Sequence, residues 1–220
     1  MKLPPRILFV GAHCDDVELL AGGLLARACY AGGTSVGVLV FSDHRGVVDA
    51  GTAERARAEM RDNIAWLAAD SGCPITDHTA ALLPACQGHF QSERAALYRA
   101  MEALRDDYDL VVTHPASDTN QDHRQVAEEA TRVFKAHTTL WAGEFPSNDV
   151  GGFAASVFVA LGEREIAAKE RMVARYRSQD FGGRPYLDPA LVRALARVRG
   201  AQIRTQWAEA FAVAARVVVR

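Results

Sequence analysis

Short apolar runs alternate with longer segments of helical periodicity along this chain. The apolar runs predict buried strands over residues 6–11, 36–41, 79–83, 109–113, 138–143, 155–160 and 212–219. The pattern is weakest over residues 79–83 and 212–219. Apolar side chains at helical spacing predict helices over residues 17–30, 53–69, 95–105, 124–135 and 163–175. Asp188 followed by Pro189 is a typical start for one more helix. This alternation predicts an α/β fold with a Rossmann-like, mostly parallel sheet flanked by helices and a mixed C-terminal extension.

Composition sets the broad class. With 220 residues, 49% of them hydrophobic, we expect a single domain over residues 1–220. The formal net charge of −2 gives no electrostatic reason to expect nucleic acid or an anionic membrane as a partner. The N-terminus lacks the apolar core of a signal peptide, and no apolar run approaches the roughly 18 residues that cross a bilayer. The 4 cysteines form no CxxC pair, so we expect thiols in a cytoplasmic protein.

Charged side chains gather where the first strand is predicted to end. His13, Cys14, Asp15 and Asp16 follow the apolar run and lead into a helix. A phosphate-binding loop would place glycines and a lysine here, whereas two carboxylates and an imidazole suit a cation. Open α/β sheets place their chemistry at strand exits, so this loop predicts half of a metal site.

A second polar cluster follows the predicted strand over residues 109–113. It contains His114, Asp118, Asp122 and His123, and a predicted helix comes directly after it. Because parallel strands end at the same edge of a sheet, the two clusters can converge although they are far apart in the sequence.

These residues resemble the motifs of a known family. The segment His13-Cys14-Asp15-Asp16 is similar to the His-Pro-Asp-Asp motif of the PIG-L/LmbE-type zinc-dependent N-deacetylases, with Cys14 at the usual proline. Residues 118–123 resemble their second motif, which ends in Asp-His followed by Arg. The resemblance continues through Glu144-Phe145-Pro146 and the tail from Arg184 to Phe211. It implies hydrolysis of an N-acetyl or similar N-acyl amide on an amino sugar or related small molecule.

By this resemblance His13, Asp16 and His123 would bind Zn²⁺, and Asp15 would be the general base. General chemistry agrees, because catalytic zinc sites use about three protein ligands and leave a position for water. Bound zinc lowers the pKa of that water from ~15.7 to about 7, and Asp15 can accept its proton. Asp122, next to His123, is a candidate partner that would orient a ligand.

Asn120 stands where many family members have a histidine three residues before the zinc ligand. That histidine is thought to stabilise the oxyanion or to protonate the leaving amine, and asparagine cannot deliver a proton at neutral pH. Either His114 or His44 acts as the acid, or Asp15 carries the proton from water to amine, or catalysis is weak. We favour a shuttle through Asp15, with Asn120 as the oxyanion donor.

Other assignments compete with simpler structural roles. Candidates for contacting the substrate are Arg45, Asp118 and Glu144, although solvated arginines are the default and Asp118 can close an Asx turn. Asp15 or Asp16 can cap the following helix, and His114 can be a structural histidine. Cys14 is better explained as a small apolar filler than as a nucleophile. The remaining histidines are each expected at the surface: His44, His78, His89 and His137.

Two further function classes remain open. Two histidines and one carboxylate also form the facial triad of non-haem iron enzymes, and metal content would separate the two. A non-catalytic Rossmann-like binding module is opposed by the acidic first loop and by the lack of G-x-G-x-x-G. The sequence does not identify the N-acyl substrate or the assembly, although soluble enzymes of this size are often symmetric homo-oligomers.

Overall fold

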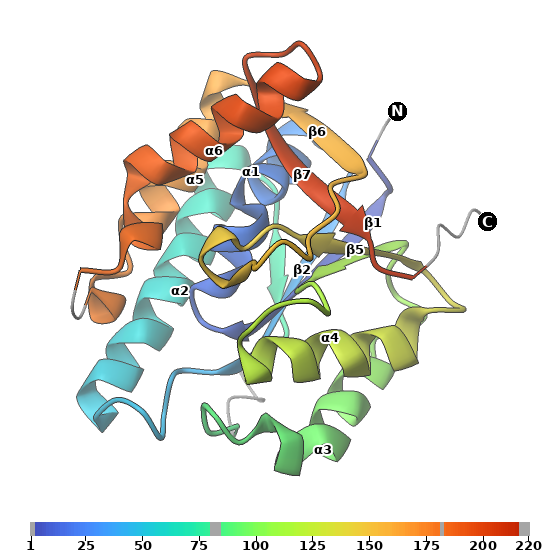
Figure 1. The fold of residues 1–220 in the computed structure, drawn as a ribbon, viewed down its shortest axis with the longest axis vertical. Coiled ribbons are helices and arrows are strands. Elements are labelled where there is room, and N and C mark those ends of the chain that lie inside the picture. The colour runs from blue at the N-terminus through green and yellow to red at the C-terminus, as the bar shows by residue number, and fades with distance from the viewer. Residues whose placement is uncertain (1–2, 80–84, 181–182, 216–220) are drawn as a thin grey trace.

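In the computed structural model, the chain forms one sheet with helices on both faces (Figure 1). The structure describes residues 3–79, 85–180 and 183–215. The 7 strands have the order β3-β2-β1-β4-β5-β7-β6. Their bounds are β1 Arg6–His13, β2 Ser35–Ser42, β3 Ile75–Asp77, β4 Leu110–Thr113, β5 Thr139–Gly143, β6 Val157–Leu161 and β7 Trp207–Val213. Strands β1 to β5 pair in parallel, whereas β7 is antiparallel to both β5 and β6. The predicted Rossmann-like sheet with a mixed C-terminal extension is therefore confirmed.

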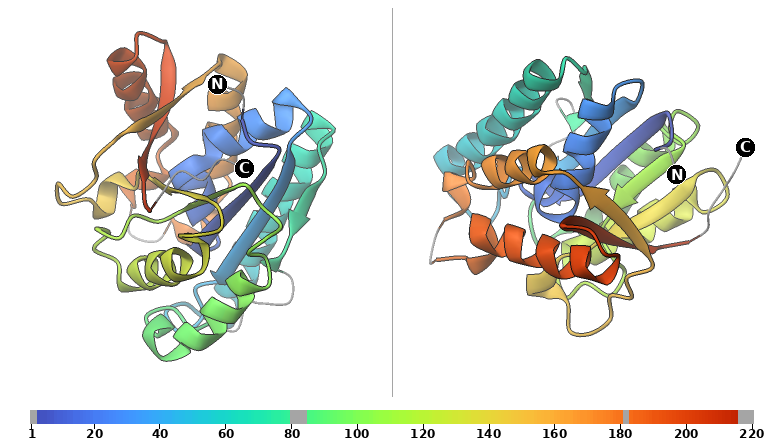
Figure 2. Two further views of the ribbon diagram at one scale, coloured as in Figure 1. Left: turned by 90° about the vertical axis from the view of Figure 1, so that its right-hand side faces the viewer. Right: turned by 90° about the horizontal axis from the view of Figure 1, so that it is seen from above.

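Helices cover the sheet in two unequal layers, which Figures 1 and 2 show from three directions. One core includes side chains of α1, α2, α5 and α6, and the other those of α3 and α4. The bounds are α1 Asp16–Ala31, α2 Ala50–Ser71, α3 Phe90–Glu102, α4 Gln121–Phe134, α5 Glu163–Val173 and α6 Pro189–Gln202. No helix within the described ranges combines the length and apolar character needed to span a membrane.

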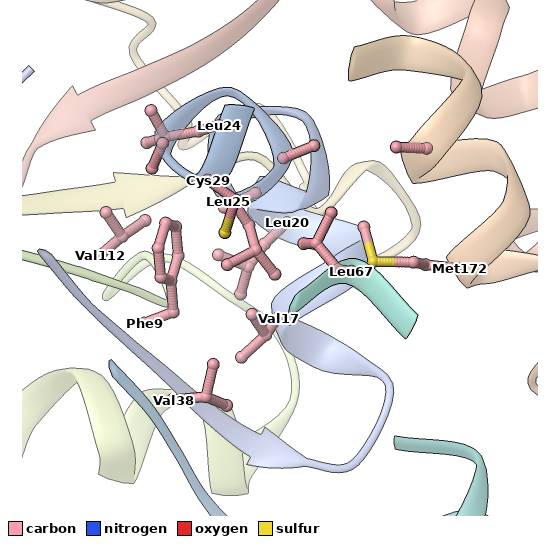
Figure 3. Packing of buried hydrophobic residues seen from close by; sticks show 14 of the residues in the cluster. Phe9, Val17, Leu20, Leu24, Leu25, Cys29, Val38, Leu67, Val112 and Met172 are labelled. Carbon is pink, nitrogen blue, oxygen red and sulfur yellow. The ribbon is translucent and has the colours of Figure 1, made fainter. Parts of the chain in front are cut away.

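Strand β1 is apolar from Ile7 to Ala12 because both of its faces are buried there. Ile7 and Phe9 belong to the larger core, and Leu8 and Val10 to the core under α3 and α4. Figure 3 shows Phe9 facing α1, with Val112 of the neighbouring β4 on the same side. Helix α1 comes directly after β1 and packs on the face of the sheet that carries Phe9 and Val112. The short loop between β1 and α1 is therefore held in a fixed position.

Strand order reverses at β1, because β2 lies on one side of it and β4 on the other. The connection after β1 leads to the β2 side of the sheet, and the chain later returns to β4 on the opposite side. Loops after β1 and β4 therefore separate at a topological switch point, where open α/β sheets bind their ligands. The two polar clusters predicted from the sequence are those two loops.

Several element boundaries differ from the sequence prediction. Helix α3 begins at Phe90 rather than at 95, because the Phe90 side chain is buried in the core and extends the apolar stripe. The last strand is Trp207–Val213 rather than 212–219, since Trp207 to Phe211 are the buried residues, and residues 216–220 lie outside the described ranges. Strand β3, at Ile75–Asp77, was not predicted, and the weak strand predicted over 79–83 lies outside the described ranges except for Thr79.

A buried ion pair braces α1 where its backbone leaves the helical conformation at Ala21. Glu209 accepts hydrogen bonds from the backbone N–H groups of Gly23 (2.8 Å) and Leu24 (2.6 Å). Lys169 donates to the Leu19 carbonyl (2.8 Å) and to Glu209 (2.7 Å). The pair, here called the α1 brace, therefore satisfies backbone groups that the helix itself leaves unpaired.

Candidate metal centre

Three side chains from separate elements present their donor atoms to one point. His13 ends β1, Asp16 begins α1, and His123 lies in the first turn of α4. His13 Nδ1 is 3.2 Å from His123 Nε2. Asp16 Oδ1 is 3.3 Å from His123 Nε2, and Asp16 Oδ2 is 3.4 Å from His13 Nδ1. All three residues are buried, and together they form a candidate ligand set for one metal ion.

The separations fit a tetrahedral divalent cation. Zinc bonds to histidine nitrogen and carboxylate oxygen of about 2.0–2.2 Å place neighbouring ligand atoms roughly 3.3–3.5 Å apart. The two imidazoles and one carboxylate are donors that zinc prefers, and three of them leave a position for a water molecule. The residues present therefore fit the metal that the sequence predicts.

Carboxylates fix the orientation of both imidazoles. Asp122 Oδ2 lies 3.2 Å from His13 Nε2, and Asp118 Oδ2 lies 2.8 Å from His123 Nδ1. Each carboxylate accepts a hydrogen bond from the N–H of the outer ring nitrogen, so the inner nitrogen keeps its lone pair for a cation. Asp122, predicted to orient a ligand, contacts His13 rather than His123, its neighbour in the sequence. Asp118 holds His123 and is not on the cavity wall, which differs from the predicted substrate contact.

The charges in this cluster favour an ionised Asp16 next to a protonated His123. Burial opposes ionisation of Asp16, but the nearby His123, His114 and His13 hold the pKa of its carboxyl well below the usual range. Burial likewise opposes a charged His123, yet Asp16 and Asp118 outweigh it and raise the pKa of His123 to about 10. Without a metal ion, a proton on His123 would therefore supply the missing charge.

The backbone of the first loop holds Asp16 in place. The N–H groups of Ala12 (2.9 Å) and His13 (2.7 Å) both donate to Asp16 Oδ2. These bonds leave Oδ1 as the oxygen with the freer lone pairs. Asp15 occupies the N-cap position of α1, but its side chain makes no capping hydrogen bond. The capping role considered for Asp15 therefore does not account for its carboxylate.

A cavity of about 140 Å³ lies beside the three ligand atoms. It is lined by His13, Asp15, Asp16, His44, Gln87, Asn120, His123, Phe145, Asn148, Arg184 and Tyr186. The side chains come from the ends of β1 and β2, from the start of α4 and from distant loops. The Asp15 carboxylate, which makes no capping hydrogen bond to α1, thus lines the same small cavity as the candidate ligands.

Asn120 and His114 occupy different positions relative to this cavity. Asn120 Oδ1 caps α4 by accepting from the N–H groups of Asp122 and His123, which leaves its amide NH₂ as a donor at the cavity wall. His114 is fully buried behind the ligands, with its ring stacked on His123 at a centroid distance of 3.9 Å. Burial and the positive charge of His123 lower the pKa of His114. Because it does not line the cavity, His114 is placed to support Asp16 (3.1 Å) rather than to meet a substrate.

Two further residues predicted to contact substrate lie elsewhere. Arg45 donates to both oxygens of Asp43 at 2.7 Å, and it is half-exposed outside the cavity wall. Glu144 is paired with Arg199 and lines a separate apolar pocket against α6. Each of the two side chains is paired with a neighbouring charge and does not line the cavity beside the ligand atoms.

His44 was expected at the surface, and that expectation is wrong. Its side chain is 4% exposed and lies in the cavity wall, 3.4 Å from Asp15. The sequence offered one signal, because His44 follows β2, the strand next to β1, and so lies at the same sheet edge. Gln87, Asn148, Arg184 and Tyr186 also line the cavity.

The Cys14 thiol is buried in this loop. It is fully buried, and its Sγ lies 3.5 Å from the Ser42 carbonyl oxygen. Burial raises the pKa of Cys14 well above its usual value, and the charges of Asp15 and Asp43 add to the effect. The geometry agrees with a small apolar filler that stays protonated.

Comparison with solved structures shows the same fold in several deacetylases. A conserved protein of Thermus thermophilus is 25% identical, with 99% of this chain and 98% of that chain covered and a TM-score of 0.73. The N,N'-diacetylchitobiose deacetylase of Pyrococcus horikoshii is 16% identical, with coverage of 95% and 83% and a TM-score of 0.70. A teicoplanin deacetylase in a zinc-inhibited form is 16% identical, with coverage of 94% and 96% and a TM-score of 0.70.

The family assignment rests on the sequence itself. No curated protein sequence matches the chain. The profile of the PIG-L family, described as GlcNAc-PI de-N-acetylase, matches residues 8–134. This segment is more than half of the 220 residues and contains all three candidate ligands. The chain belongs to the PIG-L family.

Proposed function

We propose that this protein is a zinc-dependent hydrolase that removes an N-acetyl or similar N-acyl group from an amino sugar or a related small molecule. The observation that carries the proposal is the convergence of His13, Asp16 and His123 within 3.4 Å beside the Asp15 carboxylate. Membership of the PIG-L family supports a metal-dependent N-deacetylase. Two of the similar folds, those from Pyrococcus horikoshii and from teicoplanin biosynthesis, belong to deacetylases.

The residues of the chain divide the chemistry between them. When bound, zinc supplies a Lewis acid that lowers the pKa of water and polarises the acyl carbonyl. Asp15 takes a proton from the attacking water, a contribution typically on the order of 10²–10⁴-fold. Asn120 donates its amide N–H to the oxygen on which negative charge develops. Asp118 and Asp122 keep the two imidazoles aimed at the metal throughout.

Activity assays with metal-loaded protein test this proposal. A panel of N-acetylated amino sugars, disaccharides and sugar nucleotides is incubated with the protein, and released acetate is measured. We expect at least one substrate to be hydrolysed by the wild type and none by the His123→Ala variant. Acetate release that is equally fast in the His123→Ala variant would overturn the proposal.

A conservative change separates the base from the ligands. Asp15→Asn keeps the side-chain shape but removes the proton acceptor, so we expect turnover to be lost while zinc binding is retained. Metal content measured by mass spectrometry gives the second readout. An Asp15→Asn protein with normal turnover would refute the role of Asp15.

Metal identity requires its own experiment, because two histidines and a carboxylate also suit non-haem iron. The similar teicoplanin deacetylase is described in a zinc-inhibited form, so excess zinc is itself a variable. Metal-free protein reconstituted with one equivalent of zinc, cobalt, manganese, nickel or ferrous iron is assayed on the same panel. We expect zinc to restore hydrolysis at one equivalent, and activity restored by iron alone would favour the iron alternative.

A further inference from the structure

His44 occupies a position in the cavity that the proposed function leaves unused. Its ring stacks on that of His13, with centroids 5.1 Å apart and planes inclined by 16°. Its Nδ1 lies 3.2 Å from Gln87 Oε1, and its Nε2 lies 3.4 Å from Asp15 Oδ1. Within the described residues, Nε2 is buried and makes no hydrogen bond. A buried ring nitrogen without a hydrogen bond, next to the proposed base, is poorly explained by a packing role alone.

The backbone at His44 is itself constrained. Its φ of 66° lies in the left-handed region, which few residues other than glycine adopt, although histidine and asparagine are enriched there. The next residues turn back on it, with the N–H groups of Val47 and Val48 donating to the His44 carbonyl. Asp43, one residue earlier, is anchored by Arg45 and Arg57. The loop is therefore held in the conformation that sends the His44 ring into the cavity.

The Gln87 contact determines which ring nitrogen carries the proton. A carbonyl oxygen accepts but cannot donate, so Gln87 Oε1 favours a proton on His44 Nδ1. Nε2 then carries a lone pair directed toward Asp15. The backbone of Gln87 is in turn tied to the same loop, because its N–H donates to the Arg45 carbonyl at 2.9 Å.

We propose that His44 is a catalytic residue that carries to the leaving amine nitrogen the proton that Asp15 removes from water. This inference rests on the proposed function, and it specifies how the proton travels. It also resolves the problem raised by Asn120, which can donate a hydrogen bond but cannot deliver a proton. His114, the other histidine considered for this task, is not on the cavity wall.

The relay balances without any added reactant. Asp15 takes one proton from the attacking water as the new C–O bond forms at the acyl carbon. His44 Nε2 accepts this proton from Asp15 and donates it to the amide nitrogen as the C–N bond breaks. The products are the free acid and the amine, and Asp15 and His44 return to their starting protonation states.

The variant His44→Asn tests the relay. Asparagine tolerates the positive φ of this position, so the loop can keep its conformation, but it cannot transfer a proton. On the N-acyl substrate identified by the panel, we expect kcat to fall on the order of 10²–10⁴-fold. KM and zinc stoichiometry should stay close to those of the wild type. His137→Asn, a histidine outside the cavity wall, is the matched control and should leave all three quantities unchanged.

Each outcome of this experiment decides the proposal. An unchanged kcat overturns it, and so does a fall in kcat accompanied by loss of zinc or a raised KM, which would indicate a structural role. An aryl ester with the same acyl group adds a second measurement, because a phenolate leaves without needing a proton. The His44→Asn variant should lose less activity on the ester than on the amide, and equal losses would overturn the relay. If the wild type hydrolyses no N-acyl substrate, the proposed function itself fails. If the wild type is active and the His44→Asn variant is equally active, only the relay through His44 fails.

Discussion

Two buried charged clusters in this molecule are built on opposite principles. In the α1 brace, one cation and one anion face each other, and Lys169 and Glu209 satisfy backbone groups of α1. At the metal centre, carboxylates are in excess, and their partners are imidazoles. Buried there are Asp15, Asp16, Asp118 and Asp122. A cluster that neutralises itself stabilises the fold, whereas one that leaves negative charge around a common point is prepared for a cation.

The largest effect is expected when a ligand of the metal centre is removed. Asp16→Asn deletes the one ligand that carries a full negative charge, so we expect zinc binding to be lost at micromolar concentration, and activity with it. Isothermal titration of metal-free protein with zinc measures the change. Because Asp16 also holds the first loop, circular dichroism of the variant serves as the control for folding. If Asp16→Asn bound zinc with wild-type affinity, Asp16 would not be a metal ligand, and the contrast between a metal-binding cluster and a self-neutralising one would fail.

The opposite pattern is expected at the α1 brace. Glu209→Gln leaves the Lys169 ammonium buried without its counter-ion, and breaking such a pair costs on the order of 3–5 kcal/mol of folding free energy. Urea unfolding of the metal-free protein measures this loss. The double variant Lys169→Met with Glu209→Gln should recover part of the stability, because no uncompensated charge remains. Zinc affinity of the folded protein should be unchanged, and a large loss of affinity in Glu209→Gln would show that the clusters are coupled.

A smaller effect is expected from the carboxylates behind the imidazoles. Asp118→Asn keeps a side-chain oxygen next to His123 Nδ1 but removes its charge, and such changes typically lower metal affinity about 10–100-fold. Asp122→Asn should act similarly through His13. Competition with a chromophoric chelator gives both affinities. If both variants bound zinc with wild-type affinity, Asp118 and Asp122 would have no role in metal binding.

The smallest predicted effect concerns acid stability and a third ion cluster. Burial opposes ionisation of Asp43, but hydrogen bonds from Arg45 and Arg57 lower its pKa to about 2, from an ordinary value of 3.8. A lowered pKa stabilises the fold at pH values above about 4, to an extent that the exposed guanidinium groups reduce through solvent screening. This contribution is lost as the pH falls from about 4 toward 2. Urea unfolding of metal-free protein between pH 5 and 3 should therefore show a steeper loss in the wild type than in Asp43→Asn, and parallel losses would contradict the assignment.

The sequence predicted the sheet because buried strands are a local pattern, whereas the three candidate ligands came from the family resemblance. Buried strands are continuous apolar runs, and the candidate ligands lie at the end of β1, at the start of α1 and in the first turn of α4, at one edge of the sheet. The position of His44 depended instead on which strand lies next to β1, a property of the whole sheet. The pairing of Glu144 with Arg199 joins residues 55 positions apart in the sequence, and no local spacing predicts it. Tyr186 likewise lines the cavity from a loop that is distant in the sequence, and no local pattern singles out its side chain.

One measurement tests the central claim most directly. Crystals of the protein with one equivalent of zinc are examined by anomalous diffraction at the zinc absorption edge. We expect a single strong peak about 2.0–2.2 Å from His13 Nδ1, an Asp16 oxygen and His123 Nε2. A zinc peak bound by other residues, or its absence at these three in protein that retains stoichiometric zinc, would contradict the account.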